Sequence, residues 1–299
     1  MKLANVEYEG RVRVAAVIDQ EVVDLSETGA GTLRDVSELL AMGEQREEHI
    51  KRCVKQGKSR IPLSSVKLLA PVRFPDKILG VGMNYHTFVA AVREAGVPLA
   101  RTLTWFLRPR GCICGPSDDV WLPRDANDLD YEAELAVIIG RSCRHLSAKE
   151  ARTVVAGYTV ANDLTLRERV LKSVPLGKCF DTHTPLGPWI VTDDEIGDPH
   201  QLGLKTWVNG ILRQDGNTSD MIHRCEELIA EISQVTTLHP GDILLTGTPT
   251  GSGIFSKPPL SLGPNDLVKV EIEGIGSIEN RVIAETPEIV PYREARRLD

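Results

Sequence analysis

Residues 128–140 read DLDYEAELAVIIG, and this stretch decides the fold class and the candidate site. Two acids separated by one small residue, Glu132 and Glu134, lead directly into an unbroken apolar run. In an extended strand, residues i and i+2 point to the same face, about 6.5 Å apart along the chain. Two carboxylates placed this way repel each other and are costly to bury alone, and a hard divalent cation removes that cost. An exposed edge strand, on which glutamate only adds solubility, is the open alternative.

A second apolar run, VVAGYTVANDLT (154–165), ends in an acid at the point where the chain leaves the sheet. Asp163 at this strand end can complete a three-carboxylate site for Mg²⁺ or Mn²⁺, with the remaining octahedral positions left to water and substrate. The same residue also suits the N-cap of a helix formed by LTLRERV, so both interpretations stay open here.

Three further motifs carry side chains suited to an anionic substrate. GKCFDTHTPLGPW (177–189) contains Lys178, which could hold a carboxylate or stabilise an enolate, and His183, which is more typical of a hydrogen-bonded turn. WFLRPRGCICGP (105–116) places Arg108 after an apolar run, where a surface arginine is the alternative. PGDILLTGTPTGSG (240–253) is a strand followed by a Gly- and Thr-rich loop whose backbone N–H groups could cradle a carboxylate.

The wider chain predicts an α+β fold that is mostly β. Residues 1–72 form the first of two predicted domains, a small α+β module with a helical stretch from Val36 to about Gln56 capped by Asp35. The proline-bearing link LLAPVRFPDK (68–77) separates it from residues 73–299, where short β-rich runs alternate with Gly, Pro, Asn and Asp. That pattern is typical of a sheet-rich sandwich or barrel-like body, and SDMIHRCEELIAEISQ (219–234) predicts one helix within it.

Composition restricts the function classes. The net charge of −7 and the pI near 5.6 argue against a general binder of nucleic acids or anionic membranes. Six scattered cysteines suit a reducing cytosol, and the N-terminus lacks an apolar run of signal-peptide length. We therefore expect a cytoplasmic protein that acts on a small molecule, without nucleic acid or membrane as a partner.

The order of motifs resembles the fumarylacetoacetate hydrolase family. The similarity runs from about residue 77 to 282 through VGMNY, FLRPRGCICGP, LDYEAELAVIIG, GYTVANDLT, GKCFDTHTPLGPW, VNGILRQDGNTSDMI, HPGDILLTGTPTGSG and VKVEIEGIG. The resemblance implies a mixed β-roll catalytic domain, a homodimer and bound Mg²⁺ or Mn²⁺. It also implies a 2-oxo or 2,4-dioxo acid substrate, changed by C–C hydrolysis, decarboxylation, tautomerisation or hydration.

The resemblance also assigns roles to particular residues. Glu132, Glu134 and Asp163 match the family's metal ligands, and Lys178 matches its active-site lysine. Thr248 matches the loop threonine that meets the substrate. Arg108 stands where the family usually has lysine, so the positive charge is kept with a different geometry, and it is a candidate for both catalysis and substrate binding. Val170 stands where the family usually has glutamine.

The segment NYHTFVAAVREAG (84–96) departs from the family pattern. Many hydrolytic members follow Asn-Tyr with x-x-His-x-x-Glu, a pair that activates water. Counted forward, those places hold Phe88 and Ala91; counted backward, Glu94 is kept and the histidine place is Ala91. His86 is the nearest imidazole, so His86 and Glu94 are the candidate catalytic pair and Tyr85 a candidate substrate contact. General-base assistance contributes about 10²–10⁴-fold to the rate, so an enzyme without this pair would depend on the metal and the lysine instead.

The predicted reaction is hydrolytic C–C cleavage of an acylpyruvate-like diketo acid, which is common in the family. The altered pair raises the alternatives of a decarboxylase, an isomerase or tautomerase, and a hydratase, because these reactions need no activated water at a second carbonyl. A non-catalytic homologue that binds a metal or metabolite is a further alternative. The Val, Leu and Ala content of residues 87–104 favours a substrate with an apolar tail.

Overall fold

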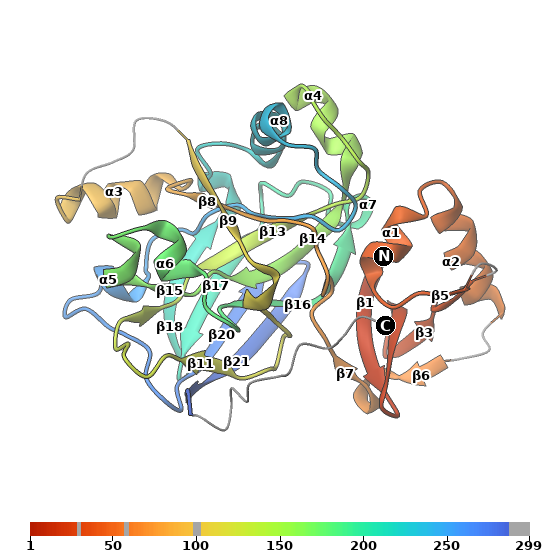
Figure 1. Ribbon diagram of the computed structural model, residues 1–299, viewed down its shortest axis with the longest axis horizontal. Coiled ribbons are helices and arrows are strands. Elements are labelled where there is room, and N and C mark those ends of the chain that lie inside the picture. The colour runs from red at the N-terminus through yellow and green to blue at the C-terminus, as the bar shows by residue number, and fades with distance from the viewer. Residues whose placement is uncertain (29–30, 57–59, 98–102, 287–299) are drawn as a thin grey trace, which may run out of the picture.

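The strand that follows Glu132 lies in the middle of a large open sheet (Figure 1). The computed structural model describes residues 1–28, 31–56, 60–97 and 103–286. In it β13 (Ala133–Ile139) is buried along its whole length, between β14 (Val155–Asn162) and β19 (Ile243–Leu245). A strand paired on both sides and covered on both faces can be continuously apolar, as this one is. The alternative of an exposed edge strand is therefore wrong.

The sheet continues in both directions from β13. Its order is β6-β3-β2-β1-β16-β14-β13-β19-β8-β9, with β10 paired to β16 and β7 paired to β1. After the N-terminal segment, the other strands of this sheet are β8 (Ile78–Gly82), β9 (Thr104–Arg108), β10 (Ile113–Cys114) and β16 (Thr184–Thr192). The antiparallel pairing of β13 with β14 places the start of β13 beside the end of β14.

A second sheet packs against one face of the first. Its order is β11-β21-β20-β17-β18, formed by β11 (Val120–Leu122), β17 (Gly203–Val208), β18 (Ile211–Asn217), β20 (Leu267–Ile272) and β21 (Gly276–Ala284). Burial alternates along β17 and β20, as expected when one face meets the core. Leu135 and Val137 of β13 join the core between the two sheets, whereas Ala136 and Ile138 join the core on the other side.

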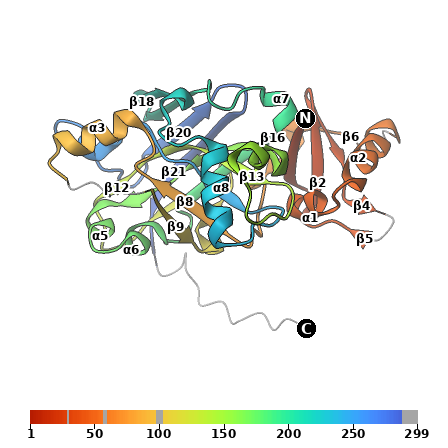
Figure 2. The same cartoon turned by 90° about the horizontal axis from the view of Figure 1, so that it is seen from above.

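The N-terminal segment extends the large sheet instead of standing apart from it (Figure 2). It comprises β1 (Lys2–Tyr8), β2 (Arg11–Ile18), β3 (Glu21–Asp24), β4 (Glu27–Thr28), β5 (Gly31–Thr32), α1 (Val36–Ala41), α2 (Gln45–Gln56), β6 (Arg60–Pro62) and β7 (Lys67–Leu68). β1 pairs antiparallel with β16. One hydrophobic core contains Leu39 of α1 and Ile243 of β19, so the division into domains 1–72 and 73–299 stays a prediction.

The predicted helix from Val36 to Gln56 is two helices, α1 and α2, separated by Met42–Glu44. Asp35 caps α1 as expected, because its carboxylate accepts a hydrogen bond from the Ser37 N–H at 2.9 Å. The same carboxylate also accepts from Asn5 in β1, which fixes the helix to the sheet.

The remaining helices lie around the body (Figure 1). They are α3 (His86–Glu94), α4 (Ala148–Ala151), α5 (Arg167–Val170), α6 (Val174–Lys178), α7 (Asp193–Ile196) and α8 (Cys225–Val235). The helix predicted over 219–234 begins only at Cys225, because residues 218–220 form a separate 3₁₀ turn; Met221 therefore lies outside the helix. A two-stranded sheet of β12 (Leu129–Asp130) and β15 (Thr165–Leu166) and five short 3₁₀ turns complete the described elements. The turns lie at Leu63–Ser65, Arg110–Cys112, Arg152–Val154, Thr218–Asp220 and Gly253–Phe255.

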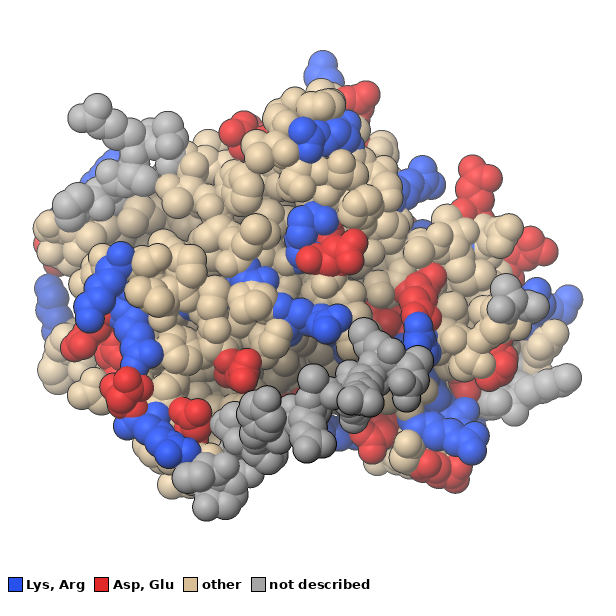
Figure 3. Space-filling model, viewed as in Figure 1, with Lys and Arg blue, Asp and Glu red and all other residues tan. Residues whose placement is uncertain are grey.

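The predicted fold class, a β-rich mixture of strands and helices, is confirmed, with sheets that stay open and do not close into a barrel. Within the described residues, every helix is too short or too polar to cross a membrane. Acidic and basic side chains are interspersed over the face seen in Figure 3. That distribution agrees with the predicted lack of nucleic-acid binding, which stays a prediction.

Candidate active site

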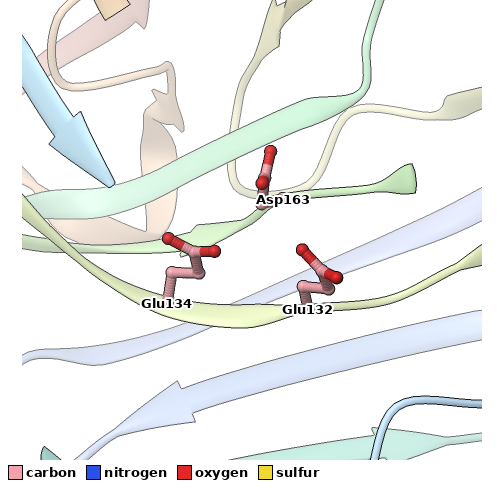
Figure 4. A group of neighbouring side chains, drawn as sticks. All are labelled: Glu132, Glu134 and Asp163. Atoms are coloured by element: carbon pink, nitrogen blue, oxygen red, sulfur yellow. The ribbon is translucent and has the colours of Figure 1, made fainter. Parts of the chain in front are cut away.

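Three carboxylates converge where β13 begins and β14 ends (Figure 4). Oxygen atoms of Glu132, Glu134 and Asp163 all lie within 4.8 Å of one another, and all three residues are buried. The backbone builds this arrangement: the Asp163 N–H donates to the Glu132 carbonyl at 2.8 Å, and the Glu132 N–H donates to the Asn162 side chain at 3.0 Å. Asp163 caps no helix, since β15 (Thr165–Leu166) follows it and α5 begins at Arg167.

Three cations surround these carboxylates. Lys178, at the end of α6, places Nζ 2.7 Å from Glu132 and also contacts Asp163. Arg108, at the end of β9, is only 3% exposed; it forms an ion pair with Asp163 and donates to the His183 carbonyl at 3.0 Å. We call Glu132, Glu134, Asp163, Lys178, Arg108 and Arg167 the charged cluster.

Arg167 is the member of the charged cluster that sequence reasoning missed. Its guanidinium contacts Glu132 at 2.7 Å and Asp130 at 2.8 Å. Asp130 is itself buried, and its carboxylate accepts from the N–H groups of Gly253 and Ile254. A signal was present in the sequence, because Asp130, Glu132 and Glu134 continue one i, i+2, i+4 alternation.

Burial and charge shift the protonation of the cluster in opposite directions. Burial, together with the neighbouring Glu132 charge, raises the pKa of Glu134 to about 8. Burial alone also favours the neutral form of Glu132, but Lys178 and Arg167 outweigh it and lower the pKa of that carboxyl. Burial lowers the pKa of the Lys178 ammonium despite its acidic neighbours. Lys178 is therefore suited to exchanging a proton.

The donor set fits a hard divalent cation. Four buried carboxylates, including Asp130, face three cations, so a proton on Glu134 balances the charge in the protein alone. Glu134 accepts from the Gly247 N–H at 2.7 Å and makes no ion pair with the described side chains. Mg²⁺ and Mn²⁺ take carboxylate oxygens of this kind and would replace that proton. Glu132, Glu134 and Asp163 are the residues that would hold the ion.

A cavity of about 350 Å³ opens beside the cluster. Glu132, Glu134, Arg167, Lys178 and Thr248 supply its charged and hydroxyl groups. Most other lining side chains are apolar: Met83, Phe88, Val92, Phe106, Val170, Val174, Ile254 and Phe255. The cavity thus combines an anion- and metal-binding end with hydrocarbon walls, as expected for a small organic acid. Part of the segment predicted to shape an apolar tail, residues 98–102, lies outside the described residues.

The candidate pair from α3 is not brought to this cavity. His86 is exposed at the first turn of α3, and Glu94 is exposed at its last turn, where it contacts Lys257 at 3.2 Å. Phe88 and Val92 are the α3 side chains that line the cavity. Tyr85 is fully buried beside α3, where burial raises the pKa of its hydroxyl, and it does not line the cavity. The roles predicted for these residues are thus not supported by their position.

Comparison with known proteins decides the family. Residues 77–283 match the family described as fumarylacetoacetate (FAA) hydrolase, C-terminal. The chain belongs to the fumarylacetoacetate hydrolase family. The resemblance inferred from the motifs is therefore confirmed over the segment that carries the charged cluster.

Three relatives illustrate the reactions named for proteins similar to this chain. A Bos taurus protein named as a mitochondrial oxaloacetate tautomerase is 42% identical over 266 residues, which cover 88% of this chain and 84% of that protein. A maleylpyruvate hydrolase from Sphingobium sp. SYK-6, solved with manganese(II) and pyruvate, is 33% identical with a TM-score of 0.80, covering 96% of this chain and 100% of that one. A 5-carboxymethyl-2-hydroxymuconate delta-isomerase from Mycobacterium smegmatis is 31% identical with a TM-score of 0.75, over 96% and 100% of the chains.

These relatives support an enzyme of this family that acts on a small oxo acid with a divalent metal. The predicted cytoplasmic location is wrong by the same comparison, because the tautomerases, including those of Homo sapiens, are mitochondrial by name. The prediction rested on the N-terminus without an apolar run of signal-peptide length and on six scattered cysteines, all of which are free in the structure. Free thiols are compatible with any reducing compartment, so they could not distinguish one from another.

Proposed function

We propose that the protein is a divalent-metal-dependent tautomerase of a 2-oxo dicarboxylic acid of the oxaloacetate class. The observation that carries the proposal is the cavity wall formed by α3, which presents Phe88 and Val92 where a water-activating pair would be needed. Tautomerisation moves one proton between a carbon and a carbonyl oxygen and consumes no water. The name of the Bos taurus relative supports the same reaction.

The residues of the cluster suit this chemistry. Glu132, Glu134 and Asp163 would hold a metal ion, which would supply Lewis-acid stabilisation of the enolate when bound. Lys178 lies at the cavity with a lowered pKa, so its amine can take the proton from the carbon next to the keto group and return it to oxygen. Arg167 lines the cavity and can pair with a carboxylate of the substrate.

Arg108 contacts the charged cluster from outside the cavity. It does not line the cavity; its guanidinium holds Asp163 and the His183 carbonyl. This contact orients a metal ligand, so we infer that Arg108 positions Asp163, and that the roles in catalysis and substrate binding assigned by resemblance are indirect.

The test separates proton transfer from bond cleavage. Oxaloacetate in D₂O is followed by NMR for deuterium entry at C3 and by absorbance for loss of the enol, with Mg²⁺ or with a chelator. The proposal expects metal-dependent acceleration of both signals without matching release of pyruvate or CO₂. If pyruvate appears as fast as deuterium, decarboxylation is the reaction and the proposal fails.

C–C hydrolysis of an acylpyruvate, the reaction placed first from the sequence, becomes the second candidate. The apolar walls formed by Phe88, Val92 and Phe255 favour it, because they suit a hydrocarbon acyl group. Pyruvate release from an acylpyruvate at a higher kcat/KM than oxaloacetate tautomerisation would establish it. The homodimer implied by the family resemblance stays a prediction, which sedimentation of the purified protein can test.

A further inference from the structure

Gln214 lies outside the charged cluster but is bonded to it through two separate segments. It belongs to β18, it is fully buried, and its side-chain amide makes four hydrogen bonds. The amide oxygen accepts from the Ala133 N–H at 3.0 Å and from the Thr206 hydroxyl at 2.8 Å. The amide nitrogen donates to the Thr248 hydroxyl oxygen at 2.9 Å and to the Pro249 carbonyl at 3.0 Å.

Two of these partners fix the orientation of the amide. A backbone N–H can only donate, so the atom that faces Ala133 is the oxygen. A backbone carbonyl can only accept, so the atom that faces Pro249 is the nitrogen. It follows that the Thr248 hydroxyl oxygen receives a hydrogen from Gln214, and that its own hydrogen must point to another acceptor.

The cavity is where that acceptor would be. Thr248 lines the cavity, and its hydroxyl donates to none of the described residues. A hydroxyl that already accepts one hydrogen bond donates well to a carboxylate or carbonyl oxygen. The other end of the Gln214 amide holds Ala133, which lies between Glu132 and Glu134.

We propose that Gln214 is a positioning residue that makes the Thr248 hydroxyl a hydrogen-bond donor toward an oxygen of the bound oxo acid. Its bond to Ala133 also fixes the Thr248 hydroxyl relative to the strand that carries Glu132 and Glu134. The inference rests on the proposed function for its substrate class. Because the bond to Thr248 serves substrate and transition state alike, Gln214 acts on KM more than on kcat.

The decisive variant is Gln214→Glu. The introduced carboxylate keeps the contacts to Ala133 and Thr206, but its second oxygen accepts the Thr248 hydrogen and draws it away from the cavity. We expect KM for oxaloacetate to rise about tenfold or more, since a hydrogen bond to a charged group is lost, while kcat changes little. Thr248→Val should raise KM by a similar factor, and Thr248→Ser should restore it.

The double variant separates positioning from a simple effect of added charge. If Gln214 acts through Thr248, Gln214→Glu adds no further rise in KM once Thr248 is valine. If the two substitutions raise KM independently, so that their factors multiply in the double variant, the inference is overturned. An unchanged KM in Gln214→Glu would also overturn it. Thr206→Val is the matched control: it removes a bond to the same amide but leaves the nitrogen in place, so it should lower the melting temperature without raising KM.

A binding measurement keeps this test independent of the reaction. Calorimetry with oxalate and Mg²⁺ should show the same loss of affinity in Gln214→Glu and Thr248→Val, with no further loss in the double variant. If the unaltered protein binds oxalate but does not tautomerise oxaloacetate, the proposed function fails and the oxalate affinities still decide the role of Gln214. If it shows no Mg²⁺-dependent oxalate binding, both proposals are overturned.

Discussion

The charged cluster and the helix α3 line the same cavity, but the cluster presents charged side chains to it and α3 presents apolar ones. The cluster is built from buried carboxylates and cations, and among the described side chains each member except Glu134 has an ionic partner. The α3 helix turns Phe88 and Val92 toward the same cavity and leaves His86 and Glu94 exposed. One wall can therefore stabilise negative charge, whereas the other offers only hydrocarbon.

This difference indicates what the cavity can do. An apolar wall excludes water, and electrostatic interactions strengthen when water is excluded. Phe88 packs edge-to-face on Phe255 at 5.4 Å between ring centroids, and Thr87 donates to Asp220, so α3 is held in place on both sides. The arrangement favours an enolate held by the cluster and disfavours attack by water.

Lys178→Met should have the largest effect on the cluster. It removes the amine that, among the described residues lining the cavity, can carry the proton, so kcat for C3 deuterium exchange should fall about 10²–10⁴-fold. Lys172→Met, an exposed lysine six residues earlier, is the control and should keep full activity. Undiminished exchange in Lys178→Met would assign the proton transfer to another group.

His183, whose backbone carbonyl accepts a hydrogen bond from Arg108, has a buried imidazole that should make the stability of the protein depend on pH. Burial lowers the pKa of His183 to about 4, whereas the unfolded value is near 6.5. Between these two pKa values the unfolded chain binds a proton at His183 and the folded chain does not. The free energy of unfolding is therefore highest above pH 6.5 and decreases by about 3 kcal/mol as the pH falls toward 4. Urea denaturation across this window should show the slope, and His183→Gln should flatten it. An equal slope in the variant would trace it to other groups.

Metal binding at the charged cluster should stabilise the folded protein, and a substitution far from the cluster should not change this effect. At Mg²⁺ concentrations near 100 times Kd, the free energy of unfolding should rise by about 2.7 kcal/mol, seen as a higher melting temperature. Glu134→Gln should abolish this shift, whereas Glu231→Gln on the exposed face of α8 should retain it. A full Mg²⁺ shift in Glu134→Gln would show that the ion binds elsewhere.

Placing an acid–base pair on α3 should reduce the contrast between the two walls. Phe88→His combined with Ala91→Glu introduces the family's water-activating residues in the forward register. We expect acylpyruvate hydrolysis to increase by about 10²-fold, the lower end of general-base assistance, measured as pyruvate release. No gain with the fold intact would mean that α3 cannot bring such a pair to the cavity.

The smallest effect is expected for the exposed residues of α3. His86→Ala and Glu94→Gln should each leave kcat/KM within about twofold, because surface substitutions away from buried features have small effects. A loss above tenfold in His86→Ala would show that α3 rearranges on substrate binding and delivers the imidazole.

The charged cluster was largely predictable from the sequence, whereas the orientation of α3 was not. The i, i+2 spacing of Glu132 and Glu134 and the strand end at Asp163 are local patterns, and local patterns set which face a side chain occupies. Arg167 and Asp130 were overlooked, although Asp130 continues the same alternation. The family's His/Glu pair could be aligned with the α3 sequence in two registers, and neither alignment predicted which side chains of α3 face the cavity.

The sequence by itself determined that two glutamates share one face of an apolar strand, because the period of a strand is fixed by the backbone. Only the tertiary structure decided that Phe88, and not His86, faces them, since the rotation of α3 depends on packing against Phe255. The same holds for Gln214, which meets Ala133 from 81 positions away in the chain. Such contacts follow from how the sheets pair and pack, and no neighbouring residue in the sequence encodes them.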